Sequence, residues 1–184
     1  MRTVFFSHAA ASIIVSGILL LVYTAIQQCY RTGANDPQIQ MARDAVLALK
    51  NNKLPVEVVP AGTVDVEGSL SPFIQVYNEE NKVVASNGLL GGNIPVIPAG
   101  VLEKAKQDGE YLVTWQPSPA ARIAAVVVYT NLAGTGYVVA GRALVEIEKR
   151  ETALRTMVFA CWLCCMGVVA AHAVLQGFLK KKDL

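Results

Sequence analysis

A single arginine interrupts an apolar run in the middle of this 184-residue chain: Arg122, within residues 120–129. Alternation along a strand would place it on a face with three apolar residues, Ala124, Val126 and Val128. A charged group there must be paired or reach water. One interpretation is an anchor for an anionic or carboxylate ligand, and three aromatic residues could form the walls of its pocket: Tyr77, Trp115 and Tyr129. The other interpretation is that Arg122 begins the strand and is solvated.

The residue types that carry out most enzymatic chemistry are missing from the middle of the chain. Both histidines, His8 and His172, fall in long apolar segments, so no Ser/His/Asp set can form in the middle. The cysteines lie in the same segments: Cys29, Cys161, Cys164 and Cys165. The glycines at 91–92 and 134–136 are too few for a dinucleotide-binding fingerprint. We therefore predict that the protein is not an enzyme and that it holds no cofactor and no metal.

Two apolar segments bracket the polar middle. Residues 3–30 and 156–179 contain no Lys, Arg, Asp or Glu, and each exceeds the roughly 20 residues that a membrane-crossing helix needs. The exit from the first segment lacks the small residues of a cleavage site, so we interpret residues 1–30 as an uncleaved signal anchor. The chain is therefore predicted to cross the plasma (inner) membrane of a bacterial cell twice.

Charge predicts the orientation and excludes one class of partner. Lys180, Lys181 and Lys182 follow the second span directly, which favours a cytoplasmic tail at 180–184. Both termini are then cytoplasmic and the middle is extracytoplasmic. Residues 31–155 hold 12 Lys and Arg against 13 Asp and Glu, a net charge of about −1, with no basic stripe. Nucleic acid is therefore not an expected partner.

Periodicity and turn residues predict a mixed α+β middle. Asp36 and Pro37 would start a helix as its N-cap and first residue, and Pro98 would start a shorter one that Gly109 ends. A hairpin is predicted from its turn at 78–81, and a short strand at 56–59. The remaining strands are expected at 110–116, 121–130 and 135–141. From 143 to 179 no helix breaker precedes Gly167, which indicates one helix continuous with the second span.

Small residues in the spans suggest close helix packing. They are Ser12 and Ser16 in the first span, and Ala160, Cys164, Gly167 and Ala171 in the second. A different interpretation is that His8 and His172 meet, as a haem or metal pair would require.

The junction with the second span suggests a route for a signal. Gly141, Arg142 and Ile147 lie where the last strand would pass into the exit helix, so they could transmit a movement of the domain. A proline at Ile147 is expected to break this rod. The alternative for Gly141 and Arg142 is a tight turn and a surface charge.

The order of elements resembles the extracytoplasmic PAS-like or Cache sensor domains of bacterial receptors and membrane histidine kinases. The resemblance lies in FIQVYNEENKVVASN at 73–87, IPAGVLEKA at 97–105 and YVVAGRALVEIEKRE at 137–151. It implies an α+β membrane protein in which two transmembrane helices flank a PAS-like (Cache-like) antiparallel-sheet domain at 31–142. The exit helix and second span then occupy 143–179. Unlike those kinases, this sequence shows no catalytic module after the second span.

Two functions remain open. The first is a receptor-like sensor that binds a small ligand and signals laterally to a partner membrane protein, such as a kinase or transporter subunit, or to a second copy in a homodimer. The second is a structural or accessory membrane protein whose domain binds another protein. A pocket with converging polar groups near Arg122 would favour the sensor, whereas a filled core with an exposed apolar patch would favour the accessory protein.

Overall fold

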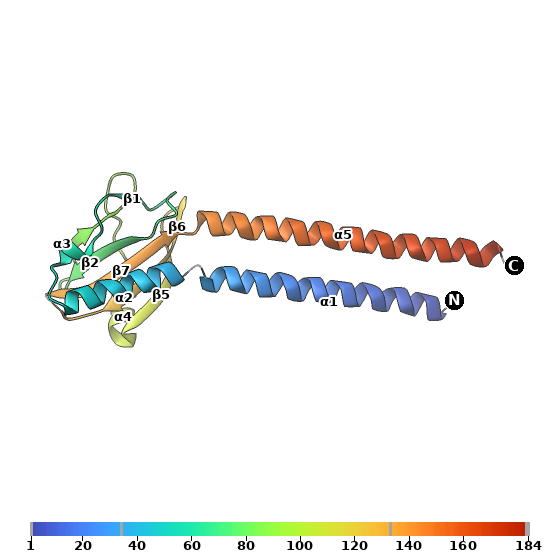
Figure 1. Cartoon of the computed structure of the whole chain (residues 1–184), viewed down its shortest axis with the longest axis horizontal. Coiled ribbons are helices and arrows are strands. Elements are labelled where there is room, and N and C mark those ends of the chain that lie inside the picture. Colours follow the sequence, from blue (N-terminus) through green and yellow to red (C-terminus); the bar gives the residue numbers. More distant parts are fainter. Residues whose placement is uncertain (1, 34, 133, 183–184) are drawn as a thin grey trace. The chain divides into compact units, whose positions relative to one another are not determined.

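The computed structural model describes residues 2–33, 35–132 and 134–182. The chain divides into two compact units, which we call the helix pair (Met1–Tyr30 with Lys149–Leu184) and the domain (Arg31–Glu148). Figure 1 labels most of their elements. The predicted α+β class with an antiparallel sheet is confirmed. Of the predicted basic tail, residues 180–182 belong to a helix, and Asp183 and Leu184 lie outside the described residues.

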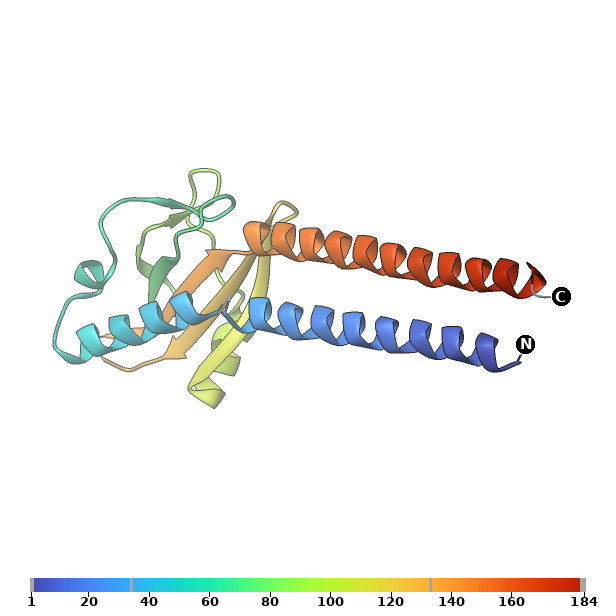
Figure 2. The ribbon, with the colours of Figure 1, turned by 45° about the vertical axis from the view of Figure 1, so that its right-hand side comes forward.

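Two helices in the described part of the chain are long and apolar enough to cross a membrane: α1 (Arg2–Gly33) and α5 (Val145–Lys182). They run side by side in Figures 1 and 2. Polar side chains join them. Trp162 Nε1 donates a hydrogen bond of 2.9 Å to Ser16 Oγ, and Gln27 donates to the Glu151 carboxylate. The later residue of α1, Gln27, contacts the earlier residue of α5, Glu151, so the two helices are antiparallel.

The domain is built on a five-stranded sheet of order β3-β2-β7-β6-β5, in which every neighbouring pair is antiparallel. Its strands are β2 (Phe73–Asn78), β3 (Val83–Ser86), β5 (Glu110–Ser118), β6 (Ala121–Tyr129) and β7 (Thr135–Ala143). The predicted hairpin is therefore present as β2 and β3. Strand β2 also pairs, on the side away from β3, with β7, which comes some 60 residues later in the chain.

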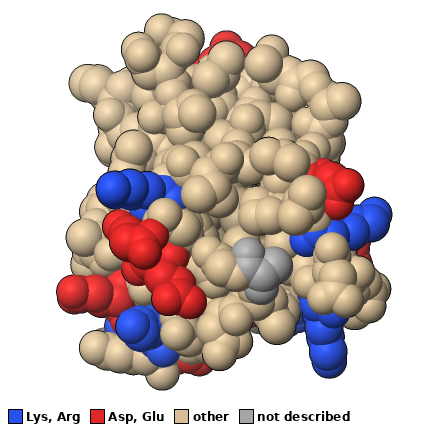
Figure 3. Space-filling view, turned by 90° about the vertical axis from the view of Figure 1, so that its left-hand side faces the viewer, with Lys and Arg blue, Asp and Glu red and all other residues tan. Residues whose placement is uncertain are grey.

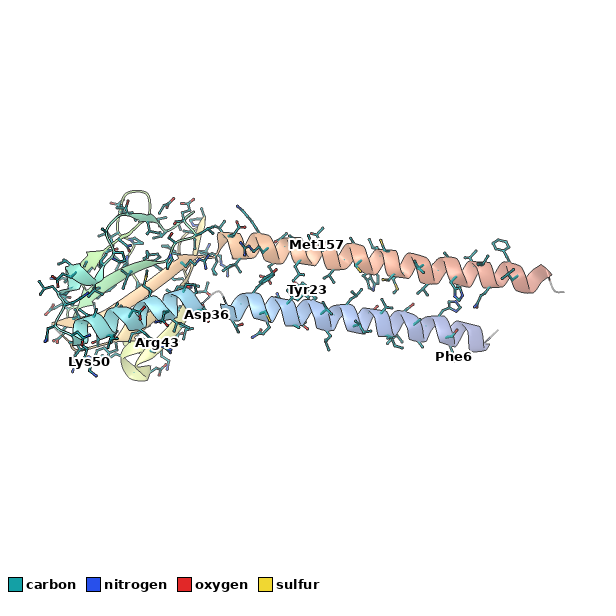
Figure 4. All side chains as sticks on the ribbon, viewed as in Figure 1. Phe6, Tyr23, Asp36, Arg43, Lys50 and Met157 are labelled. Atoms are coloured by element: carbon teal, nitrogen blue, oxygen red, sulfur yellow. The ribbon has the colours of Figure 1, made fainter. Side chains whose placement is uncertain are left out.

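Helix α2 (Asp36–Lys50) covers one face of the sheet (Figure 4, between Asp36 and Lys50). Its buried residues Ala42, Ala45 and Leu49 recur at helical spacing and pack on residues of the central strands: Ile74, Val126, Val138 and Ala140. The helix starts one residue earlier than predicted. Asn35 is its N-cap and Asp36 is already helical, so the carboxylate sits in the first turn, where the helix dipole favours a negative charge.

Helix α4 (Ala99–Asp108) packs on the opposite face. Pro98 precedes it, and Gly109 ends it with a φ of 83°, a backbone conformation that glycine adopts without strain. Leu102 and Ala105 of α4 join the larger core cluster of the domain. The end of α4 agrees with the prediction from the sequence, whereas its start lies one residue later, because Pro98 is the N-cap.

Two short segments differ from the prediction. Residues expected to form a strand at 56–59 form instead a single helical turn, α3 (Pro55–Val58), because Pro55 opens it and the Glu57 carboxylate accepts a 2.8 Å hydrogen bond from Leu54 N–H. In addition, β1 (Val64–Asp65) and β4 (Gly88–Leu89) pair in parallel as a small second sheet. Their pairing joins segments far apart in sequence, and no local pattern indicated it.

The junction before α5 also lies later than predicted. Strand β7 continues through Arg142 and Ala143 by pairing with β6, so the helix begins at Val145. From there α5 continues without a break to Lys182, as one continuous helix.

Candidate functional site

The four residues predicted to line a ligand pocket do not come together. Arg122 shares the face of the sheet covered by α2, as alternation predicted, because Val126 and Val128 of the same strand face pack there. The three aromatic residues belong to the opposite face and to the cluster around α4: Tyr77, Trp115 and Tyr129. The predicted pocket is therefore wrong. The sequence shows which residues of one strand share a face. It does not show which faces of different strands coincide, because that depends on how the strands pair.

Arg122 takes part in an exposed ion pair. Its guanidinium pairs with the Glu148 carboxylate in the first turns of α5, and both side chains are roughly half exposed. Its carbonyl oxygen also accepts a 2.8 Å hydrogen bond from Leu144 N–H, just before the helix. Such exposed pairs contribute little stability, about 0–1 kcal/mol. Their value here is positional, since β6 holds the start of α5 through two bonds.

Tyr77 closes a buried polar network. Its phenol donates to Gln75 Oε1 at 3.1 Å and accepts from Ile97 N–H at 3.0 Å, while Gln75 Nε2 donates to the Pro95 carbonyl at 2.9 Å. Tyr77 and Gln75 are fully buried. This network fastens the segment before α4 to strand β2. The phenol thus has a structural partner on each side and no free group for a ligand.

Burial raises the pKa of the Tyr77 phenol above its ordinary value, and the hydrogen bond from Ile97 N–H offsets part of that rise. The unfolded chain releases this proton near pH 10, whereas the folded domain retains it to higher pH. The contribution of Tyr77 to stability is therefore complete below about pH 10 and decreases as the pH rises further.

Replacing Tyr77 with phenylalanine should destabilise the domain by about 1–3 kcal/mol at pH 7, because Gln75 Oε1 and Ile97 N–H lose a buried partner. It should also flatten the decline of stability above about pH 10. Urea unfolding at several pH values measures both effects. Val113→Ala, at a half-buried position of the same cluster, controls for destabilisation alone. A decline as steep in Tyr77→Phe as in that control would contradict the assignment.

The other two aromatic residues pack in the core cluster. Trp115 is nearly buried there. Tyr129 lies at its edge, where its ring meets Tyr137 edge-on at 5.5 Å and Lys106 Nζ lies 5.7 Å from its centroid. Both residues therefore fill and cover the core.

Gly141 and Arg142, predicted to transmit a signal, have packing roles. A Cβ on Gly141 would lie 2.6 Å from Phe73 Cζ, so this glycine makes room for an aromatic ring. Arg142 is a β7 residue in register with Ala124 on the α2 face. Its Nε and the Oε1 of fully buried Gln38 are the two buried side-chain atoms that lack a hydrogen bond in the described residues. Arg142 is thus partly covered and not a simple surface charge.

Ile147 is the third residue of α5, in the first turn. The backbone N–H groups of a first turn have no partner within the helix, and proline is tolerated there. We therefore expect a proline at Ile147 to be tolerated, unlike the break expected from the sequence. The later start of α5 is the reason.

The small residues proposed for helix packing separate into two groups. Ser12 and Ser16 are partly covered, and Ser16 bonds to Trp162. Four residues of α5 are exposed and not on the covered side of this helix: Ala160, Cys164, Gly167 and Ala171. The covered side carries larger residues, among them Val158, Trp162 and Cys165. The close helix packing predicted for the four exposed residues stays a prediction.

An open groove on the α2 side of the domain is the candidate functional site. Its volume is about 450 Å³. Helix α2, the segment 53–60 and strand β2 form it, with the following lining residues: Pro37, Gln40, Met41, Asp44, Ala45, Ala48, Lys53, Glu57, Val58, Pro60 and Ile74. No motif predicted this groove, because its two walls come from a helix and a connection whose approach depends on the fold.

Polar groups at the groove are few and largely engaged. Gln40 Nε2 donates a 2.7 Å hydrogen bond to Asp44 Oδ1, and the Glu57 carboxylate caps α3. With Lys53, the lining carries two acidic groups and one basic group. Beside these, Leu47, Leu54 and Val56 are each more than half exposed. The site is therefore suited to apolar side chains and a basic group, and it holds no catalytic set.

Metal ligands are equally sparse. Within the described residues, no group of three or more His, Cys, Asp or Glu side chains could hold a metal ion. His8 and His172 do meet, with 3.2 Å between His8 Nε2 and His172 Nδ1.

Comparisons of this chain with protein-family models, with curated proteins and with solved structures found no match.

Proposed function

We propose that this protein is a two-pass membrane protein whose extracytoplasmic domain binds a segment of another membrane protein. The apolar lengths of α1 and α5 support two membrane spans, and the lysines after α5 support cytoplasmic termini. A partner in the same membrane is favoured because the anchored domain stays near its surface. The PAS-like or Cache-like character of the domain remains part of this proposal, supported by the order of its elements.

The groove beside α2 carries the proposal. A volume of about 450 Å³ would suit a small molecule, but small-molecule sites enclose 70–90% of their ligand, whereas this groove is open. Exposed Leu47, Leu54 and Val56 extend the apolar surface beyond it. A chain segment can cover such a surface. The excess acidic group among Asp44, Glu57 and Lys53 favours a segment that carries a basic residue.

A lateral sensor is the second candidate. The observation in its favour is that Arg122 and Leu144 fasten β6 to the start of an unbroken α5. A shift of the sheet could therefore move the second helix. Against it stands the filled core around Tyr77 and Trp115, which leaves the predicted ligand walls inside the protein.

Leu47→Cys tests the proposed function in a chain whose four native cysteines are serine. Because Leu47 is exposed beside the groove, a membrane-impermeant maleimide should label it in intact cells, and a photoreactive maleimide should join it to a partner protein. Filling the groove with Ala48→Trp should reduce that adduct at least about tenfold, equivalent to about 1.4 kcal/mol or more of binding.

Glu80→Cys, in the exposed turn after β2, is the matched control. The maleimide should label this cysteine in intact cells as well as it labels Leu47→Cys. The photoreactive reagent should give either no adduct there or an adduct that Ala48→Trp leaves unchanged. Labelling of both positions only after lysis would reverse the topology. An adduct at Leu47 that survives Ala48→Trp would reject the groove as the binding surface.

A further inference from the structure

The two histidines of the chain lie against each other, one from each helix of the helix pair. His8 Nε2 is 3.2 Å from His172 Nδ1, and the ring centroids are 5.3 Å apart. Ser16 and Trp162 join the same two helices about two to three turns away. The meeting of the histidines is therefore part of a regular antiparallel alignment and not an isolated contact.

The outer nitrogen of each ring faces a polar side chain. His8 Nδ1 lies 3.5 Å from Ser7 Oγ, and His172 Nε2 lies 3.3 Å from the Gln176 amide nitrogen. A Gln amide rotated by half a turn presents its oxygen to the same ring atom, so Gln176 can accept a hydrogen bond from His172 Nε2–H. When the outer nitrogens carry the protons, both facing nitrogens present lone pairs. In the other tautomers one facing nitrogen donates a hydrogen bond to the other across the same 3.2 Å, whereas in this one both lone pairs are available to a cation between them.

That separation matches a metal site. In a tetrahedral zinc site with Zn–N bonds of about 2.0–2.1 Å, neighbouring ligand nitrogens are about 3.3 Å apart. We propose that His8 and His172 together bind a divalent transition-metal ion of the zinc class, with water in the remaining positions. Imidazole nitrogen is a preferred ligand of such ions. Gln176 would be a positioning residue, since hydrogen bonds to the outer nitrogen orient a ligating histidine.

The location suits an ion that exchanges with water. The Gln27–Glu151 and His8–His172 contacts are 19 residues apart on α1, or about 29 Å at 1.5 Å per residue. This is close to the roughly 30 Å of a bilayer hydrocarbon core. If the helices span a membrane as proposed above, the site lies near the boundary away from the domain. A bound ion would cross-link the two helices there.

The test is Zn²⁺ binding to the purified full chain in detergent, by competition with a chelating dye. We expect one ion per chain. His8→Ala and His172→Ala should each weaken binding by more than about 100-fold, because even a supporting residue is worth 10- to 100-fold. Gln176→Leu should weaken it about tenfold. Ser12→Ala, on the covered side of the same helix, is the control and should leave it unchanged.

The cysteines of α5 are the main competing ligands. A variant with Cys29, Cys161, Cys164 and Cys165 replaced by serine should bind Zn²⁺ as the natural chain does. Binding that disappears in this variant, or that persists in the His8→Ala/His172→Ala chain, would overturn the proposal. Absence of binding by the natural chain would also overturn it, without bearing on the groove of the domain.

Discussion

Phe73→Ala should remove about 3–5 kcal/mol from the stability of the domain, out of the 5–15 kcal/mol typical of a natural protein. Phe73 is fully buried in β2. Its ring lies against glycines: a Cβ added to Gly88 would be 2.5 Å from Phe73 Cδ2, and one added to Gly141 would be 2.6 Å from Cζ. Neither glycine has a side chain that could move into the vacated space. The cavity therefore stays open, and we expect the upper part of the range.

Urea unfolding of residues 31–155, expressed without the apolar parts of α1 and α5, measures this loss. That segment is itself expected to be soluble, since it contains the whole domain unit. Leu112→Ala in the exposed part of β5 is the control and should cost less than about 1 kcal/mol.

A double variant makes the test specific to the ring. Gly141→Val alone should destabilise the domain, because its side chain would collide with Phe73 and with Ile123. Combined with Phe73→Ala, the same change should fill part of the cavity, so that the double variant loses less than the sum of the two single variants. Additive losses, or a loss below about 1.5 kcal/mol for Phe73→Ala, would contradict this packing.

Ala153→Pro should open α5 locally by about 3 kcal/mol, whereas Ile147→Pro should have little effect. Ala153 is exposed and lies in the third turn of the helix, where proline removes a backbone hydrogen bond and collides with the preceding turn. Amide hydrogen exchange near residue 153 should therefore accelerate about 100-fold. Ile147 lies in the first turn, so its variant is the matched control for proline itself.

The same two variants separate the proposed functions. Partner binding through the groove should survive both, because the domain is not changed. A response of the partner that is lost in Ala153→Pro and kept in Ile147→Pro would favour the sensor with α5 as its lever. If hydrogen exchange around residue 153 stayed as slow as in the natural chain, the assumption that α5 is broken there would itself be wrong.

Local features of the sequence predicted most elements correctly, and the failures have identifiable causes. Pro98 and Gly109 favour particular backbone conformations at their own positions, so the sequence predicted the limits of α4 to within one residue. Strand β7 extended past Gly141 because β6 was available to pair with Arg142 and Ala143, which is a property of the assembled sheet. Residues 56–59 are β-branched enough to suggest a strand, but Pro55 and the bond from Leu54 N–H to the Glu57 carboxylate favour a helical turn there.

The sequence by itself determined that two helices are long and apolar, where the strands alternate, and on which strand face Arg122 lies. Helix and strand periods are local properties of the chain. Only the tertiary structure decided which faces of different strands coincide. The strand register put Arg122 and the three aromatic residues on opposite faces of the sheet, and the fold brought Glu148 to Arg122. The same holds for the helices: both are apolar all around, so sequence could not select the sides that meet. Their alignment brought His8 to His172, because one antiparallel register sets every contact along the pair.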